Sequence, residues 1–187
     1  MVQVDSVPTP NHAPNPDAPA RQSTTKRRIR IRSAERRYFI GGSDARTIMG
    51  DDEAALLRLW REKRGEVEPE DLSANLVVQL GLATEDLNRR WYEANSGQVL
   101  ADVERHIRHP VLRWMAATLD GRVEATGAVF EAKFMLPWSF SEEAAAEKYM
   151  AQLQHNMWVV AARSAVLSVI TGGGKPVRLS STMSARR

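Results

Sequence analysis

Hydrophobic positions recur with helical spacing over much of the chain, most clearly between residues 76 and 94. There they follow one another at steps of seven, four and three, at Leu80, Leu87, Trp91 and Ala94. This spacing places the four side chains on one face of a helix. The pattern therefore predicts a helix with a single buried stripe, and the Asn-Ser-Gly triplet that follows is typical of a helix end.

Two other segments have the same helical spacing. They run from Glu53 to Arg64 and from Glu142 to Ala161. Their apolar positions are Leu56, Leu57, Leu59 and Trp60 in the first segment and Met150, Leu153, Met157 and Val160 in the second. In the second segment we interpret Met157 and Trp158 as core residues. A shorter helix is predicted over residues 45–49.

Four runs are short and apolar, as strands are. They are Val99 to Val103, Trp114 to Leu119, Gly127 to Lys133 and Ser164 to Thr171. The predicted order is helix, helix, strand, strand, strand, helix, strand. That order indicates an α/β or α+β fold, in which helices flank a central mixed sheet.

The two ends of the chain differ in composition from the middle. Residues 1–30 are rich in Pro, Asn, Ser, Thr and Ala, and such a segment is expected to be disordered because it has little apolar surface to bury. Residues 31–174 are expected to form one folded domain. Residues 175–187 are basic and have no amphipathic pattern, so we interpret them as a tail.

Charge and cysteine content restrict the classes of function. The formal net charge is +3, but eight Lys or Arg residues against one acid lie between positions 21 and 37. Such a cluster suits a polyanion, although a solvated basic tail explains it equally well. The chain has no Cys, which excludes thiolate zinc sites and cysteine nucleophiles and fits a reducing compartment. With no signal-peptide pattern and no apolar run of about 20 residues, we expect a cytoplasmic protein without a membrane span.

The residues with the clearest chemical potential are Asp120, Glu131 and Lys133. In a strand over residues 127–133, Glu131 and Lys133 point to one face while Phe130 points into the core behind them. Two carboxylates and the carbonyl of Ala132 are oxygen ligands of the kind Mg²⁺ takes. Such a cation assists phosphodiester cleavage, and an amine beside it can orient or deprotonate the attacking water.

Simpler interpretations of the same residues stay open. Asp120-Gly121 fits a hairpin turn, and Glu131 with Lys133 fits a solvent-facing pair on a strand. Glu85 would add a third carboxylate if its side of the helix faced the strands. Gln152 and His155 share a face of the later helix, and a hydrogen-bonded or surface role is the preferred interpretation of His155 over a metal ligand.

Four blocks of sequence, in this order, resemble the YqaJ-type viral recombinase nucleases, the family of phage lambda exonuclease within the PD-(D/E)XK superfamily. The blocks are RRYFIGGSDA (36–45), LGLATED (80–86), TLDGRVEATGAVFEAK (118–133) and EKYMAQLQHNMWVV (147–160). The resemblance implies a restriction-endonuclease-like core and a DNA nuclease that works from 5′ to 3′ on double-stranded DNA with Mg²⁺, Mn²⁺ being the alternative metal. It further implies a phage or prophage origin, a single-strand annealing protein as partner, and a homotrimer.

The same resemblance implies a role for each matched position. Asp120, Glu131, the Ala132 carbonyl and Glu85 would form the metal site. Lys133 would be the catalytic lysine, with Gln152 beside it. A DNA phosphate would be held by Ser43 with Arg36 or Arg37, between which one sequence cannot choose.

The chain departs from the family pattern at its end. Relatives add a strand and helices where residues 175–187 stand, so we expect a shortened domain whose sheet has an open edge. Two other functions therefore compete with the exonuclease: an inactive DNA-binding remnant, and an endonuclease with the same core.

Overall fold

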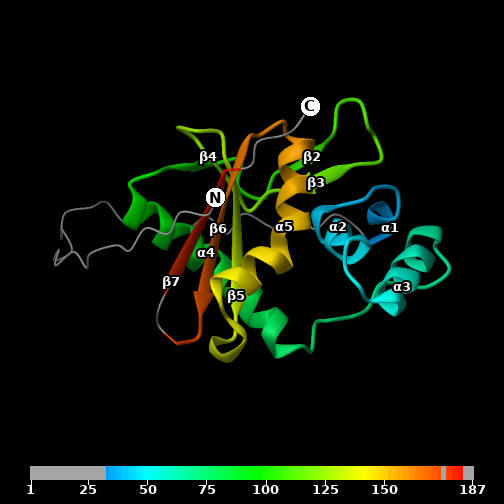
Figure 1. Cartoon of the computed structure of the whole chain (residues 1–187). Coiled ribbons are helices and arrows are strands. Elements are labelled where there is room, and N and C mark those ends of the chain that lie inside the picture. Colours follow the sequence, from blue (N-terminus) through cyan, green and yellow to red (C-terminus); the bar gives the residue numbers. More distant parts are fainter. Residues whose placement is uncertain (1–32, 174–175, 183–187) are drawn as a thin grey trace.

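The computed structural model describes residues 33–173 and 176–182, and their elements form one mixed α/β arrangement (Figure 1). Helices lead the chain and strands dominate its middle. The first elements are α1 (Ser33–Arg36), α2 (Gly42–Ile48), α3 (Glu53–Arg64), α4 (Leu76–Ser96), β1 (Leu100–Ala101), β2 (His106–Arg108) and β3 (Ala116–Thr118). They are followed by β4 (Gly121–Val123), β5 (Val129–Met135), a 3-10 turn η1 (Pro137–Ser139), α5 (Glu142–Val159), β6 (Ser164–Thr171) and β7 (Pro176–Thr182).

The main sheet of the described residues has the strand order β1-β4-β5-β6-β7. Its central pair, β5 and β6, is parallel, and the other neighbours are antiparallel. A parallel pair needs a crossover connection, and here α5 supplies it. A separate small antiparallel sheet consists of β2 and β3. The expected mixed sheet flanked by helices is therefore confirmed.

Local sequence signals explain where the helices begin and end. The side chains of Asp52, Asn75 and Ser141 accept hydrogen bonds from backbone amides in the first turns of α3, α4 and α5. Gly65 and Gly97 end α3 and α4 with φ angles of 73° and 66°, a conformation that glycine adopts without strain. The predicted bounds of α3 match the structure, and those of the two longer helices match within two residues.

The alternation along β5 divides the core into two clusters. Val129 and Met135 pack with β6 and the inner face of α5, while Phe130 and Ala132 pack with α4 and β1 on the other side. The two long helices thus cover opposite faces of the sheet. Figure 1 shows α2 beside α5, with α3 farther out.

Two predictions about burial are wrong, and the strands differ from expectation in two places. In α4 the buried residues are Asn88, Arg89 and Tyr92, and the predicted stripe fails because Leu87 is half exposed. Trp158 is also exposed, at 57%. The simpler interpretation of Asp120-Gly121 as a hairpin turn does not hold, because the residues that follow Asp120 pair as β4 with β5. β2 lies in a segment for which no strand was predicted.

The interpretation of residues 175–187 as a tail is wrong for residues 176–182. They form β7, which pairs with β6 along its whole length, from Ser164 opposite Thr182 to Ile170 opposite Pro176. The physical reason is that an open strand edge offers backbone donors and acceptors to any extended segment, whatever its side-chain pattern. Pro176 stands at the first position of the strand, where a missing N–H is tolerated. The predictions for residues 1–30 lie outside the described residues.

Candidate active site

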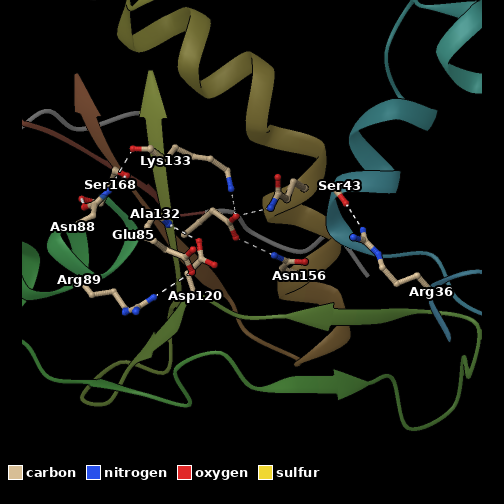
Figure 2. A network of polar contacts seen from close by, with 12 residues as sticks. Arg36, Ser43, Glu85, Asn88, Arg89, Asp120, Ala132, Lys133, Asn156 and Ser168 are labelled. Atoms are coloured by element: carbon tan, nitrogen blue, oxygen red, sulfur yellow. Dashed lines mark hydrogen bonds and ion pairs between the residues drawn. The ribbon is translucent and has the colours of Figure 1, made fainter. Parts of the chain in front are cut away.

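Lys133 of β5 extends toward α5 (Figure 2), and it contacts Glu131, two residues earlier on the same strand. The Lys133 ammonium donates to Glu131 Oε1 at 2.5 Å. Two α5 side chains donate to the same carboxylate, Gln152 to Oε1 at 2.5 Å and Asn156 to Oε2 at 3.1 Å. With 2% of its surface exposed, Glu131 is a buried carboxylate whose position is fixed by three donors.

Asp120 lies directly before β4, and its side chain contacts Ala132, the residue of β5 between Glu131 and Lys133. Its Oδ2 accepts a hydrogen bond from the amide of Ala132 at 2.9 Å. Burial raises the pKa of Asp120 well above its ordinary value, and the negative charges of Glu131 and Glu85 raise it further. Lys133 and the Ala132 amide oppose this increase without cancelling it. Asp120 is thus a carboxyl group in a place crowded with negative charge.

The pKa of Lys133 is the balance of two opposed effects. Burial alone would lower the pKa of this ammonium, but the carboxylates of Glu131 and Asp120 outweigh burial and raise it above the ordinary value. Lys133 therefore carries a positive charge at neutral pH. Its charge interacts with Glu131 and Asp120, the two acidic residues expected beside it from the sequence.

Glu85 approaches from α4, on the other side of the sheet. Arg89, one turn later, donates to Glu85 Oε1 at 3.2 Å, and only 10% of the Arg89 side chain is exposed. Figure 2 shows Glu85 and Asp120 pointing toward the same place beside Ala132. The expectation that Glu85 faces the strands agrees with this arrangement, because its charge acts on Asp120.

The acidic side chains do not form a ready cluster of metal ligands. Within residues 33–173, no three His, Asp or Glu side chains come together closely enough to hold a metal ion by themselves. Glu131 is held by three protein donors and Glu85 by Arg89. The expected ligands therefore lie in the same region, but their oxygen atoms do not converge on a single metal position.

Of the two arginines expected near Ser43, the structure brings one to it. The Arg36 guanidinium donates to Ser43 Oγ at 3.3 Å, and both residues are exposed. Arg37 instead donates to the hydroxyl of Tyr38 and lies over its ring. Arg36 is thus the arginine that the structure brings to Ser43.

Several residues that position the site were not singled out from the sequence. Asn156 is one, although its spacing of four from Gln152 places both on one face of α5. Asn88 is another: its amide donates to the carbonyl oxygens of Ser168 at 2.9 Å and Lys133 at 3.4 Å, which ties α4 to β5 and β6. The preferred interpretation of His155 is confirmed, since its ring nitrogen lies 3.0 Å from a backbone carbonyl oxygen and the residue is buried.

The sequence profile of the YqaJ-like viral recombinase domain matches residues 33–171, most of the chain. The chain belongs to this family. In sequence it is similar to YqaJ of Bacillus subtilis (strain 168), with 31% identity over 147 residues. The match covers 75% of this chain and 46% of that relative, so the chain spans about half the length of the curated protein it matches.

Two solved structures with the same fold come from exonucleases. One is LHK-Exo, an alkaline exonuclease from Laribacter hongkongensis, whose complex with dAMP superposes with a TM-score of 0.65 at 17% identity over 81% of this chain and 80% of that one. The other is a phage-related exonuclease from Haemophilus somnus 129PT, with a TM-score of 0.58 at 15% identity over 71% and 68%. These likenesses confirm the restriction-endonuclease-like fold. Among the described residues, no helix is both long and apolar enough to span a membrane.

Proposed function

We propose that this protein is a metal-dependent nuclease that hydrolyses phosphodiester bonds in DNA. The observation that carries the proposal is the arrangement at β5, where Lys133 contacts the buried Glu131 and Asp120 is bonded to the amide between them. Membership in a viral recombinase family and a fold shared with two exonucleases support it. A solvent-facing Glu-Lys pair would not account for a carboxylate that is 2% exposed and held from α5.

The residues present fit a hard divalent cation, Mg²⁺ or alternatively Mn²⁺. The ligands would be the carboxylates of Asp120, Glu131 and Glu85 and the carbonyl of Ala132, all of them oxygen donors. The fit rests on the raised pKa of Asp120, which comes first from burial and then from the charges of Glu131 and Glu85, because a bound cation would offset those charges. When bound, the metal would polarise a phosphoryl oxygen and make the attacking water more acidic.

The protein side chains would then position the reactants. Lys133, charged and anchored to Glu131, would orient the attacking water and offset the charge that develops on the phosphate. Because its pKa is raised, orientation and charge are a better role for Lys133 than removal of a proton. Gln152 would keep Glu131 in place from α5 and lie beside the scissile phosphate.

The finer activity we propose is 5′ to 3′ digestion of double-stranded DNA in phage or prophage recombination. Arg36 and Ser43 would hold a phosphate of the DNA, since a guanidinium and a hydroxyl are common phosphate donors. Assembly into a homo-oligomer and cooperation with a single-strand annealing protein belong to the same proposal. These parts rest on family membership.

The decisive test compares wild type with Lys133→Ala on linear duplex DNA, with Mg²⁺ or EDTA. We expect wild type to release nucleotides only with Mg²⁺, and the variant to be slower by about a hundredfold or more. Gln152 and Asn156 still hold Glu131 in the variant, and circular dichroism checks that the variant is folded. Arg90→Ala, which removes an exposed cation on α4, is the matched control and should retain activity.

Three outcomes would change the assignment. Equal rates for wild type and Lys133→Ala would remove the catalytic role of that lysine. Salt-sensitive DNA binding without cleavage under any metal would indicate a DNA-binding remnant. Cleavage of closed circular DNA would indicate an endonuclease in place of an end-dependent exonuclease.

A further inference from the structure

Three cations from three different elements surround the ring of Tyr149. The Arg46 guanidinium of α2 lies 5.7 Å from the ring centroid, the Lys133 ammonium of β5 5.4 Å, and the Lys148 ammonium of α5 5.5 Å. Tyr149 itself is 5% exposed, so the ring is a buried platform between α2, α5 and the sheet. The face of an aromatic ring attracts cations, and this attraction explains in part why the three charged side chains lie around Tyr149.

Two of these three charges have no acidic partner in the part of the chain that the structure describes. Lys133 is paired with Glu131, but no ion pair is formed there by Arg46 or Lys148. The residues three and four positions away in the chain are also uncharged: Gly42, Ser43, Met49, Gly50, Ala144, Ala145, Ala151 and Gln152. Arg46 and Lys148 therefore bring two positive charges to one ring without an acidic partner of their own, and a bound anion would offset the repulsion between them.

The position of Arg46 is fixed by close packing between α2 and α5. Gly42, at the start of α2, is buried so tightly that a Cβ there would lie 2.5 Å from Asn156 Oδ1 and 2.9 Å from Gln152 Cγ. Such approach leaves no room for α2 to shift against α5. Because Asn156 also bonds to Glu131, the side chains of α2 are held in a constant relation to the candidate active site.

Two of the three cations are connected to the two places already assigned to DNA. Arg46 follows Ser43 by three residues on α2, so the two share a helix face. Lys133 contacts Glu131 of the candidate active site. We propose that Arg46 and Lys148 bind a DNA phosphate between the Arg36–Ser43 pair and the phosphate to be cleaved. This inference rests on the proposed function for its ligand, DNA.

The test is the salt dependence of DNA binding, measured by fluorescence anisotropy of a labelled blunt duplex in EDTA between about 50 and 200 mM salt. Each cation that neutralises a phosphate contributes about 0.9 to the slope of log Kobs against log[salt]. We expect Arg46→Gln and Lys148→Gln each to lower the magnitude of the slope by about 0.9, an affinity loss of about eightfold near 0.1 M salt. Arg46→Lys keeps the charge and should keep the slope.

Arg163→Gln is the matched control, because it removes an exposed cation from the turn beyond the other end of α5. Lys148 is exposed as well, so its variant tests the inference without risk to folding. A wild-type slope in either glutamine variant overturns the inference, as does an equal loss in Arg163→Gln. Wild-type protein that binds DNA but does not cleave it would refute the proposed nuclease alone, because this readout needs no metal. Wild-type protein that cleaves DNA while both glutamine variants keep the slope would refute this inference alone.

Discussion

Replacing Asp120 with Asn should make the metal-free protein more stable at neutral pH while it abolishes metal-dependent cleavage. Asn is nearly isosteric and can still accept the hydrogen bond from the Ala132 amide. What it removes is a negative charge placed beside Glu131 and Glu85, where burial and those charges raise the pKa of Asp120. The carboxylate is thus an unfavourable group that the fold tolerates.

The size and pH dependence of this gain follow from the direction of the pKa shift. Each unit by which folding raises a carboxyl pKa costs about 1.4 kcal/mol of stability once the group is ionised. The variant should therefore be the more stable protein, and each kcal/mol that it gains raises Tm by about 2–4 °C for a chain of this size.

The folded state binds the Asp120 proton more tightly than the unfolded state does. Wild-type stability relative to the variant is therefore unaffected below about pH 4 and falls as pH rises from there through the raised pKa. The Tm difference should be near zero in acid and grow toward neutral pH.

Divalent metal should reverse the order of stability. A ligand at about 100 times its Kd stabilises the state that binds it by about 2.7 kcal/mol, so Mg²⁺ should raise the Tm of wild type well above that of the variant. Thermal unfolding by circular dichroism between pH 4 and 8, with EDTA or Mg²⁺, measures both the pH dependence and the metal dependence of the Tm difference. Asp86→Asn, at an exposed carboxylate of α4, is the control and should show no gain. An Asp120→Asn variant that is less stable at neutral pH in EDTA would show that the crowding of charge is not as we describe it.

Three other changes test the supports of the site. Gly42→Ala should lower the free energy of unfolding in urea by about 1–3 kcal/mol, because its Cβ would displace Asn156. Gly81→Ala, with open space around it, should raise that free energy by up to about 1 kcal/mol. Similar effects at both positions would contradict the packing argument. Lys63→Met should lower the free energy of unfolding by about 2 kcal/mol, because the Lys63 ammonium donates to Asp44 Oδ2 at 2.5 Å and to two backbone carbonyls. This loss is somewhat smaller than the loss from breaking a fully buried ion pair. In a double-mutant cycle of urea unfolding, Lys63→Met with Asp44→Asn should lose less than the sum of the single changes, and strict additivity would show that the two residues do not interact. Gln152→Ala should lower kcat with little change in KM in steady-state digestion, because it frees one side of the Glu131 carboxylate; an effect on KM alone would place Gln152 in DNA binding.

The central part of the candidate site was predictable because it is local. Glu131 and Lys133 are alternate residues of one strand, so their common face follows from the pleat, and Phe130 is buried behind them as expected. Asp120 came from the resemblance and from its chemistry. The structure adds that it bonds to the amide of Ala132, a contact between two strands that a single sequence does not specify.

The buried face of α4 was not predictable from hydrophobic spacing. Its partners on that face are polar: Asn88 bonds to Ser168, 80 residues away, and Arg89 bonds to Glu85. A buried polar side chain is stable only when donors and acceptors meet it, and for Asn88 those come from strands far along the chain. Hydrophobic spacing therefore selected Leu87, which is half exposed, over Asn88, which is 1% exposed.

The pattern on α3 shows the converse limit. Its bounds were predicted correctly, yet none of its residues is buried, and Leu57 and Trp60 are 47% and 50% exposed. Amphipathic spacing reports that a helix has an apolar face, but which surface covers that face depends on the rest of the fold. β7 makes the same point for strands, since it pairs with β6 without any side-chain pattern that predicts it.

Glu131 is the residue at which local and distant information meet. Lys133 contacts it from the same strand, and Gln152 and Asn156 contact it from α5. Because β5 and β6 are parallel, the chain must cross over between them, and α5 is that crossover. The crossover that the parallel sheet requires thus also places the side-chain amides of Gln152 and Asn156 against the Glu131 carboxylate. A change that loosened α5 against the sheet would release Glu131 without altering any residue of β5.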